Sequence, residues 1–169
     1  MRRIDTACTG ALLVYATIVL VWAALCGPFG LNHDEHQFMA SAFMVARAGL
    51  QPYQDFAYFH MPNLVYLYAP FFFTASPFLA ARLLAGLCAV GIGLTTFLFA
   101  RALFAGHEKL SRLLVPLAGT ALLVHSPLMH DTASHVWNHT PATLCALLAF
   151  LGVFAQPLEY VVHYIFGDM

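Results

Sequence analysis

Charged side chains are scarce in this chain. They make up 9% of its 169 residues, while hydrophobic residues make up 61%. A soluble domain carries roughly a quarter charged residues, so this sequence has too little polar surface to cover itself in water. The composition therefore predicts an integral membrane protein. The net charge of −1 leaves no basic patch, which excludes nucleic acid as a partner.

The cysteines lack the spacing of a metal site or a disulfide framework. Cys8, Cys26, Cys88 and Cys145 all fall in or beside apolar segments, where a free thiol behaves as a small buried side chain. A cleavable signal peptide is also disfavoured. The apolar run after the first residues is long for one, and no small-x-small cleavage site follows it. We therefore expect an uncleaved first span.

Long apolar runs are abundant. A transmembrane helix needs about 20 apolar residues, and residues 8–27, 79–104, 113–129 and 140–156 meet or approach that length. A fifth run, residues 62–75, is short and contains Asn63 and Pro70. The predicted fold is thus all-α and polytopic, with about four transmembrane spans.

The basic residues predict the orientation, because cytoplasmic loops carry an excess of lysine and arginine. If residues 62–75 do not cross the membrane, five of the seven basic residues are cytoplasmic: Arg2, Arg3, Arg101, Lys109 and Arg112. We therefore expect residues 62–75 to form a juxtamembrane helix on the outer face, where aromatic side chains are favoured. Both chain ends are then cytoplasmic, and residues 28–78 form a large outer loop.

Acidic and histidine side chains gather at the start of this loop, in His33-Asp34-Glu35-His36. Asn32 as N-cap with Glu35 three residues later is a capping-box pattern. Capping explains one carboxylate well, but two carboxylates with two histidines less well. A transition-metal site is an alternative, although His33 and His36 lack the His-Glu-x-x-His spacing of zinc hydrolases.

The order of motifs along the chain resembles that of GT-C glycosyltransferases, and most closely the protein O-mannosyltransferase and aminoarabinose-transferase type. The likeness covers most of residues 1–155. Its motifs are Asp34-Glu35 after the first span, Gly49-Leu50-Gln51-Pro52-Tyr53-Gln54-Asp55-Phe56, His60-Met61-Pro62, Ser76-Pro77-Phe78-Leu79-Ala80-Ala81-Arg82-Leu83, and Ala100-Arg101-Ala102-Leu103-Phe104.

This resemblance implies that residues 1–169 are the N-terminal transmembrane portion of a larger enzyme. Members of the family transfer a sugar from a polyprenyl-phosphate carrier to an acceptor hydroxyl on the outer membrane face, with inversion. The partners implied are a lipid-linked sugar donor and membrane lipid, and the location is a bacterial inner membrane with the site facing the periplasm. The roles implied are general base for Asp34, a supporting carboxylate for Glu35, donor-phosphate contacts for Arg82 and His60, and loop support for Asp55 and Tyr53.

No metal ligands follow from the resemblance, but a divalent ion is one way to offset the charge of a phosphate leaving group. The chain also departs from the family pattern. His60-Met61-Pro62 stands where the family usually has a lysine and two prolines, and the family's enzymes usually have several hundred residues. The alternative is a non-enzymatic membrane protein, such as a scaffold, a binding subunit or a truncated gene product. A metal-binding or transport protein built on the outer histidines is a third reading.

Overall fold

The computed structural model describes residues 33–104, 107–108, 110–137 and 139–155, with Gly10, Val14, Tyr15, Ile18 and Trp22. Within these residues the chain is all-α, as predicted. It has six α-helices and one short 3₁₀ helix: α2 (His33–Ala48), α3 (Asn63–Tyr68), η1 (Ala69–Phe73), α4 (Pro77–Leu103), α5 (Ser111–Val124), α6 (Pro127–Ser134) and α7 (His139–Ala155).

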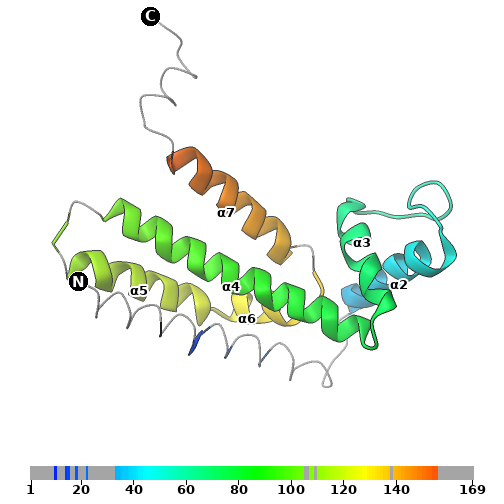
Figure 1. Cartoon of the computed structure of the whole chain (residues 1–169), viewed down its shortest axis with the longest axis horizontal. Helices are drawn as coiled ribbons and strands as arrows, with labels where there is room; N and C mark the ends of the chain where they lie inside the picture. The colour runs from blue at the N-terminus through cyan, green and yellow to red at the C-terminus, as the bar shows by residue number, and fades with distance from the viewer. Residues whose placement is uncertain are drawn as a thin grey trace, which may run out of the picture.

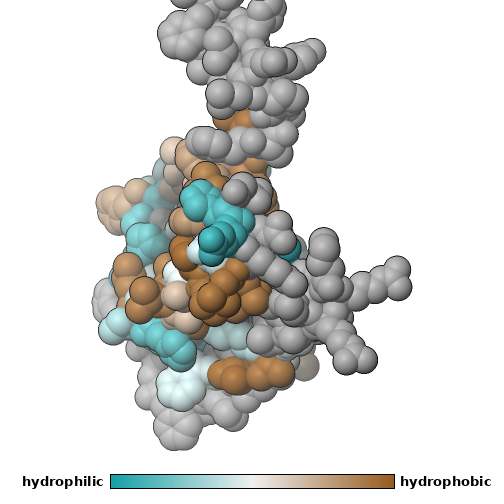
Figure 2. Space-filling model, turned by 90° about the vertical axis from the view of Figure 1, so that its left-hand side faces the viewer, coloured by the Kyte–Doolittle hydropathy of each residue, from teal (hydrophilic) through white to brown (hydrophobic). Residues whose placement is uncertain are grey.

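Helix α4 is the centre of the arrangement (Figure 1). Helices α5, α6 and α7 all pack against it, while α2 and α3 gather beyond its N-terminal end. The 3₁₀ helix η1 contacts both α2 and α4, and so joins the two groups of helices. Figure 2 views the opposite end, where α4 ends and α5 begins, and shows hydrophilic patches set within hydrophobic surface.

The predicted span over residues 79–104 is present as α4. Pro77 stands in its first turn, where the missing N–H costs no helical hydrogen bond. Arg101 lies in the last turn, where a cation complements the helix dipole. Its 27 residues include an 18-residue window with a mean hydropathy of 2.1, so α4 is long and apolar enough to cross a membrane.

The predicted span over residues 113–129 is broken. Helix α5 ends at Val124 and α6 begins at Pro127, and the two axes differ by 61°. Ser126 is the N-cap of α6: its Oγ accepts a hydrogen bond from the Met129 N–H at 3.2 Å. A serine cap followed by proline at the first position starts a new helix, and this local signal prevails over the continuous apolar run.

The remaining apolar segments are shorter than spans. Helix α7 has 17 residues, which is about 25 Å at 1.5 Å per residue, against about 30 Å of hydrocarbon. The predicted helix over residues 62–75 exists as α3 followed by η1 and is too short to cross. By length and composition, the described residues thus hold one membrane-length helix, or two if the bent pair counts as one span, rather than four. Most of the predicted span over residues 8–27 lies outside the described residues.

Two buried clusters hold these helices together. The first joins α2, the following loop, α3, the start of α4 and the segment after α6, through Phe38, Met39, Ala42, Tyr58, Leu64, Val65, Tyr68, Ala81 and Val136. The second lies along the middle of α4 against α6, through Ala89, Ile92, Met129 and Ala133. The first cluster surrounds the polar residues singled out in the sequence.

Candidate functional site

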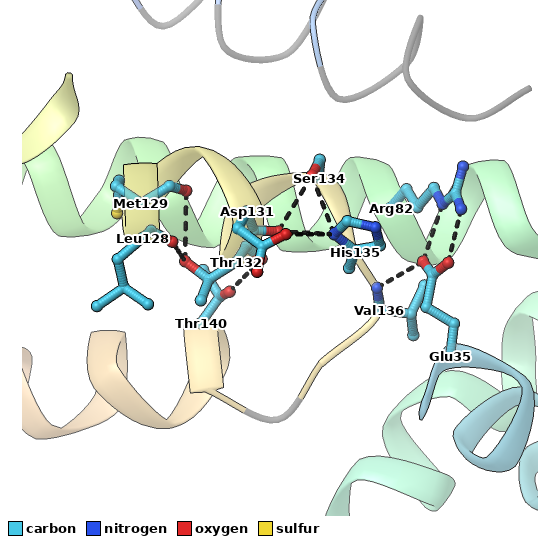
Figure 3. Close-up of polar contacts among 10 residues, drawn as sticks. All are labelled: Glu35, Arg82, Leu128, Met129, Asp131, Thr132, Ser134, His135, Val136 and Thr140. Atoms are coloured by element: carbon cyan, nitrogen blue, oxygen red, sulfur yellow. Dashed lines mark hydrogen bonds and ion pairs between the residues drawn. The ribbon is translucent and has the colours of Figure 1, made fainter. Parts of the chain in front are cut away.

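A buried ion pair joins the start of α2 to the start of α4 (Figure 3). The Arg82 Nε donates to Glu35 Oε1 at 2.9 Å, and its Nη2 donates to Oε2 at 2.6 Å. The two side chains are 2% and 0% exposed. This two-bond geometry suits a planar guanidinium and a carboxylate, so the pair fixes both the distance and the relative rotation of the two helices.

The same carboxylate also binds the segment between α6 and α7. The backbone N–H of Val136 donates to Glu35 Oε1 at 2.8 Å, across 101 residues of sequence (Figure 3). Val136 is itself fully buried in the first cluster. Glu35 is therefore the point where the predicted outer loop of residues 28–78, the helix α4 and the segment between α6 and α7 meet.

Burial makes this arrangement sensitive to the loss of either partner. Removing a charge from water costs several kcal/mol, which attraction and hydrogen bonds then offset. When one partner is removed, the other remains as an uncompensated buried charge, at a cost of about 3–5 kcal/mol. The observed contacts therefore give Glu35 and Arg82 a structural role, whatever chemistry takes place nearby.

Tyr68 lies beside the pair, on α3. It is fully buried, and its hydroxyl points to the backbone carbonyl of Trp137 across a long 3.5 Å. Burial raises the pKa of the Tyr68 hydroxyl, with smaller contributions from nearby Cys88 and Glu35. Tyr68 therefore stays neutral and brings a third element, α3, against the segment that Glu35 holds.

Asp34 precedes Glu35 in the first turn of α2, but its side chain is exposed. Successive helical residues are about 100° apart around the axis, so one carboxylate can be buried while its neighbour faces water. The predicted capping partner Asn32 lies outside the described residues. His36 is also exposed and contacts Phe78 edge-on, with 6.1 Å between ring centroids.

His60 lies against the aromatic residues of the first cluster. Its exposed ring is 5.3 Å from the Phe38 ring and 6.0 Å from the Tyr58 ring, centroid to centroid. Its backbone carbonyl accepts a hydrogen bond from the Tyr53 hydroxyl. Phe38 is one helical turn from Glu35 on α2, so His60 approaches the same end of that helix.

Tyr53 and Asp55 both make local contacts in the loop after α2. The Asp55 carboxylate accepts from the Gln51 backbone N–H at 2.7 Å, and the Tyr53 N–H donates to the Phe56 carbonyl at 3.0 Å. Tyr53 adopts a φ of +69°, which is uncommon for a residue with a Cβ. These bonds close a tight turn that leads the chain back towards His60.

The structure thus brings Glu35 and Arg82 together and leaves Asp34 and His60 exposed close to the α2 end of that pair. In the part of the chain that the structure describes, no three His, Cys, Asp or Glu side chains converge to hold a metal ion.

Sequence reasoning missed the segment that follows α6. His135 Nδ1 lies 2.8 Å from the Asp131 carbonyl, and its ring stacks on Trp137 at 5.5 Å between centroids. Trp137 also meets His139 edge-on at 5.7 Å. A backbone amide that binds a distant carboxylate has no signature in its own sequence, so the role of Val136 could not be found from sequence.

No protein-family model, no curated protein and no solved structure matches this chain. Functional assignment therefore rests on the residues and their geometry.

Proposed function

We propose that this chain is the N-terminal portion of a membrane glycosyltransferase. In this proposal a sugar passes from a polyprenyl-phosphate donor to an acceptor hydroxyl on the outer membrane face, with inversion. One observation carries the proposal. The Glu35–Arg82 pair fixes the first turn of α2 at the end of the membrane-length helix α4, and the adjacent carboxylate of Asp34 remains exposed there.

Asp34 is the general base of this proposal. It takes the proton of the acceptor hydroxyl as the acceptor oxygen forms its bond to the anomeric carbon. The bond from that carbon to the phosphate oxygen breaks at the same time, and the phosphate leaves with the electron pair. A base must lie about 2.6–3.2 Å from the hydroxyl it deprotonates, so it has to be exposed, as Asp34 is.

The phosphate leaving group needs a nearby cation. His60 is exposed, its ring packs against Phe38 of the first cluster, and it is assigned this contact when protonated. The guanidinium of Arg82 is buried against Glu35, which favours a bracing role for Arg82 over direct phosphate binding. Glu35 is then a positioning residue. A divalent metal ion held jointly with the donor phosphate is a further source of positive charge.

Composition and the length of α4 support a place in the membrane, the basic residues support the orientation, and the resemblance supports the bacterial location. The N-terminus is assigned to the cytoplasm of a bacterial cell and the α2–α3 region to the periplasmic face of the inner membrane. The exposed aromatic side chains Tyr66 and Phe73 of α3 and η1 then lie at headgroup depth.

The test is sugar transfer by Asp34→Asn in membranes that contain the full-length enzyme. Transfer from a lipid-linked donor to an acceptor should be lost while membrane insertion is unchanged. Glu108→Gln is the matched control, because Glu108 is an exposed carboxylate near the opposite end of α4. Full activity of Asp34→Asn would remove this residue from the mechanism.

A non-enzymatic scaffold or binding subunit is the second candidate. The observation that favours it is that Glu35 and Arg82, the strongest polar contact described here, bind one another and a backbone amide. That arrangement by itself stabilises a helical assembly. Under this alternative, substitution of Asp34 changes neither transfer nor any other property of membranes containing the protein.

A further inference from the structure

A cavity of about 380 Å³ lies beside the bent α5–α6 pair, with walls that also come from α4 and α7. Its walls come from Ile92 on α4, Leu123 on α5, Met129 on α6, Trp137 in the following segment and Thr143 on α7. The volume is within the roughly 300–1,000 Å³ range of ligand pockets. The 61° break at Ser126 and Pro127 opens the space.

Three hydroxyls in the wall bond to backbone carbonyls, while Trp137 Nε1 is buried without a hydrogen-bond partner among the described residues. The Ser126 hydroxyl donates to the Leu123 carbonyl at 2.7 Å, and the Thr132 hydroxyl donates to the Leu128 carbonyl at 2.9 Å. The Thr140 hydroxyl donates to the Thr132 carbonyl at 2.8 Å (Figure 3). Each hydroxyl has a single proton, so these groups offer methyl and methylene surface rather than donors.

The wall carries almost no charge. Among the residues that line the cavity, His139 alone can ionise, and Asp, Glu, Lys and Arg are all absent from that set. An anionic or strongly polar ligand would lose its hydration without compensation there, at a cost of several kcal/mol. The wall therefore favours an apolar hydrocarbon ligand over a charged one.

The depth of the cavity agrees with this chemistry. Ile92 lies near the middle of α4 and thus near the middle of the bilayer when α4 crosses it. Within the hydrocarbon region, a broken helix is tolerated only where it is buried in protein or lines a cavity. At that depth the molecules surrounding the protein are lipid acyl chains.

We propose that this cavity binds an acyl chain of a membrane phospholipid. The proposal rests on the membrane placement given above and is independent of sugar transfer. The chain fills the space that the α5–α6 break leaves and packs against Ile92, Met129 and Trp137.

Tryptophan fluorescence tests it directly. The chain has two tryptophans, so Trp22→Phe leaves Trp137 as the sole reporter in the cavity wall. In nanodiscs made with a phospholipid brominated on its acyl chains, bromine should quench Trp137 strongly. In the same protein, Thr143→Phe places a ring in the cavity and should abolish most of that quenching.

Ala142→Phe is the matched control, because Ala142 is the exposed neighbour of Thr143 on α7 and does not line the cavity. It should leave the quenching unchanged. Equal quenching in both phenylalanine variants would overturn the proposal, because bulk lipid would then account for it. Displacement of the brominated lipid by small amounts of polyprenyl phosphate, but not by unlabelled phospholipid, would overturn the acyl assignment in favour of an isoprenoid chain.

A second measurement does not depend on any substitution. The unmodified protein, purified in detergent and examined by native mass spectrometry, should retain a phospholipid. Complete absence of bound lipid, together with unquenched Trp137, would end the proposal. Absence of sugar transfer by the unmodified full-length enzyme, with lipid still bound, would contradict the proposed function alone.

Discussion

Glu35 and Arg82 stand 47 residues apart in the sequence and form a buried pair with two hydrogen bonds of 2.9 and 2.6 Å. The pair connects the first turn of α2 to the first turns of α4. The N–H of Val136 adds a third element to the same carboxylate. Three segments that lie far apart in the sequence are thereby held in a defined relative position.

The pair predicts a specific pattern of stability. Arg82→Met leaves the Glu35 carboxylate buried without its cation and should destabilise the fold by about 3–5 kcal/mol. The double variant Glu35→Leu with Arg82→Met removes both charges and should recover a large part of that loss. Chemical unfolding in detergent micelles measures both.

Arg101→Met is the control for loss of a positive charge. Arg101 is half-buried at the other end of α4, where its guanidinium lies 5.7 Å from the centre of the Phe97 ring. Its loss should cost about 1 kcal/mol or less. A double variant no more stable than Arg82→Met would contradict the account of the pair as a coupled unit.

Substitution of the two neighbouring carboxylates, Glu35 and Asp34, should change the stability of the protein by different amounts. Glu35→Gln removes the carboxylate that binds the buried Arg82 and should cost about 3–5 kcal/mol. Asp34→Asn removes an exposed charge in a first helical turn and should cost about 0.3–1 kcal/mol. Thermal unfolding distinguishes the two. Comparable destabilisation by both would show that Asp34 is also part of the structural contact.

The buried hydroxyl of Tyr58 leads us to expect that the protein loses stability at alkaline pH. This hydroxyl has no hydrogen-bond partner among the described residues. Burial, with a smaller contribution from Tyr53, raises its pKa from 10.0 to about 12. The unfolded chain releases this proton first, so the contribution of Tyr58 is fully present below pH 10 and is lost as the pH rises to about 12.

Tyr58→Phe should remove this component of the pH dependence. At neutral pH it should be neutral or stabilising by about 1 kcal/mol, because an unpaired buried hydroxyl is removed. Tyr66→Phe, at an exposed tyrosine on α3, is the control and should leave the alkaline profile unchanged. If the unfolding free energy of the wild type and that of Tyr58→Phe fall in parallel between pH 10 and 12, Tyr58 is not the source of the alkaline loss of stability.

Gly49 is required by the end of α2. It has a φ of +67°, and the N–H of the next residue, Leu50, donates to the Met44 carbonyl at 3.2 Å. Gly49→Ala should therefore destabilise the protein by about 1–2 kcal/mol. Gly119→Ala is the matched change, because Gly119 lies inside α5 with open space at its Cβ position. It should stabilise by up to about 1 kcal/mol. Equal effects would mean that the end of α2 does not need a left-handed residue.

Local signals in the sequence were sufficient for several elements. The run over residues 79–104 is predominantly apolar, with Arg82 and Arg101 as its charged residues, and it follows Pro77, so helix α4 could be predicted. Gly49 could be predicted as the residue that ends α2, because a helix C-terminus favours a residue that tolerates positive φ. The short helix over residues 62–75 followed from its length and its prolines.

The break between α5 and α6 could have been predicted and was not. Mean hydropathy over residues 113–129 indicates one continuous apolar run. Ser126 followed by Pro127, however, is a local signal for the start of a new helix. The cavity beside that break depends on how α7 and α4 approach it, so no local pattern indicates it.

Composition and local pattern alone determined the all-α class, the apolar helix α4 and the polar residues at the start of α2, because these depend on neighbours in the sequence. Tertiary structure decided which carboxylate is buried. The local pattern around Asp34 and Glu35 does not indicate which of the two is buried, and only the tertiary structure brings Glu35 to Arg82 and Val136. The physical reason is that a buried charge needs its partner within hydrogen-bonding distance, and a partner 47 or 101 residues away is supplied by the fold.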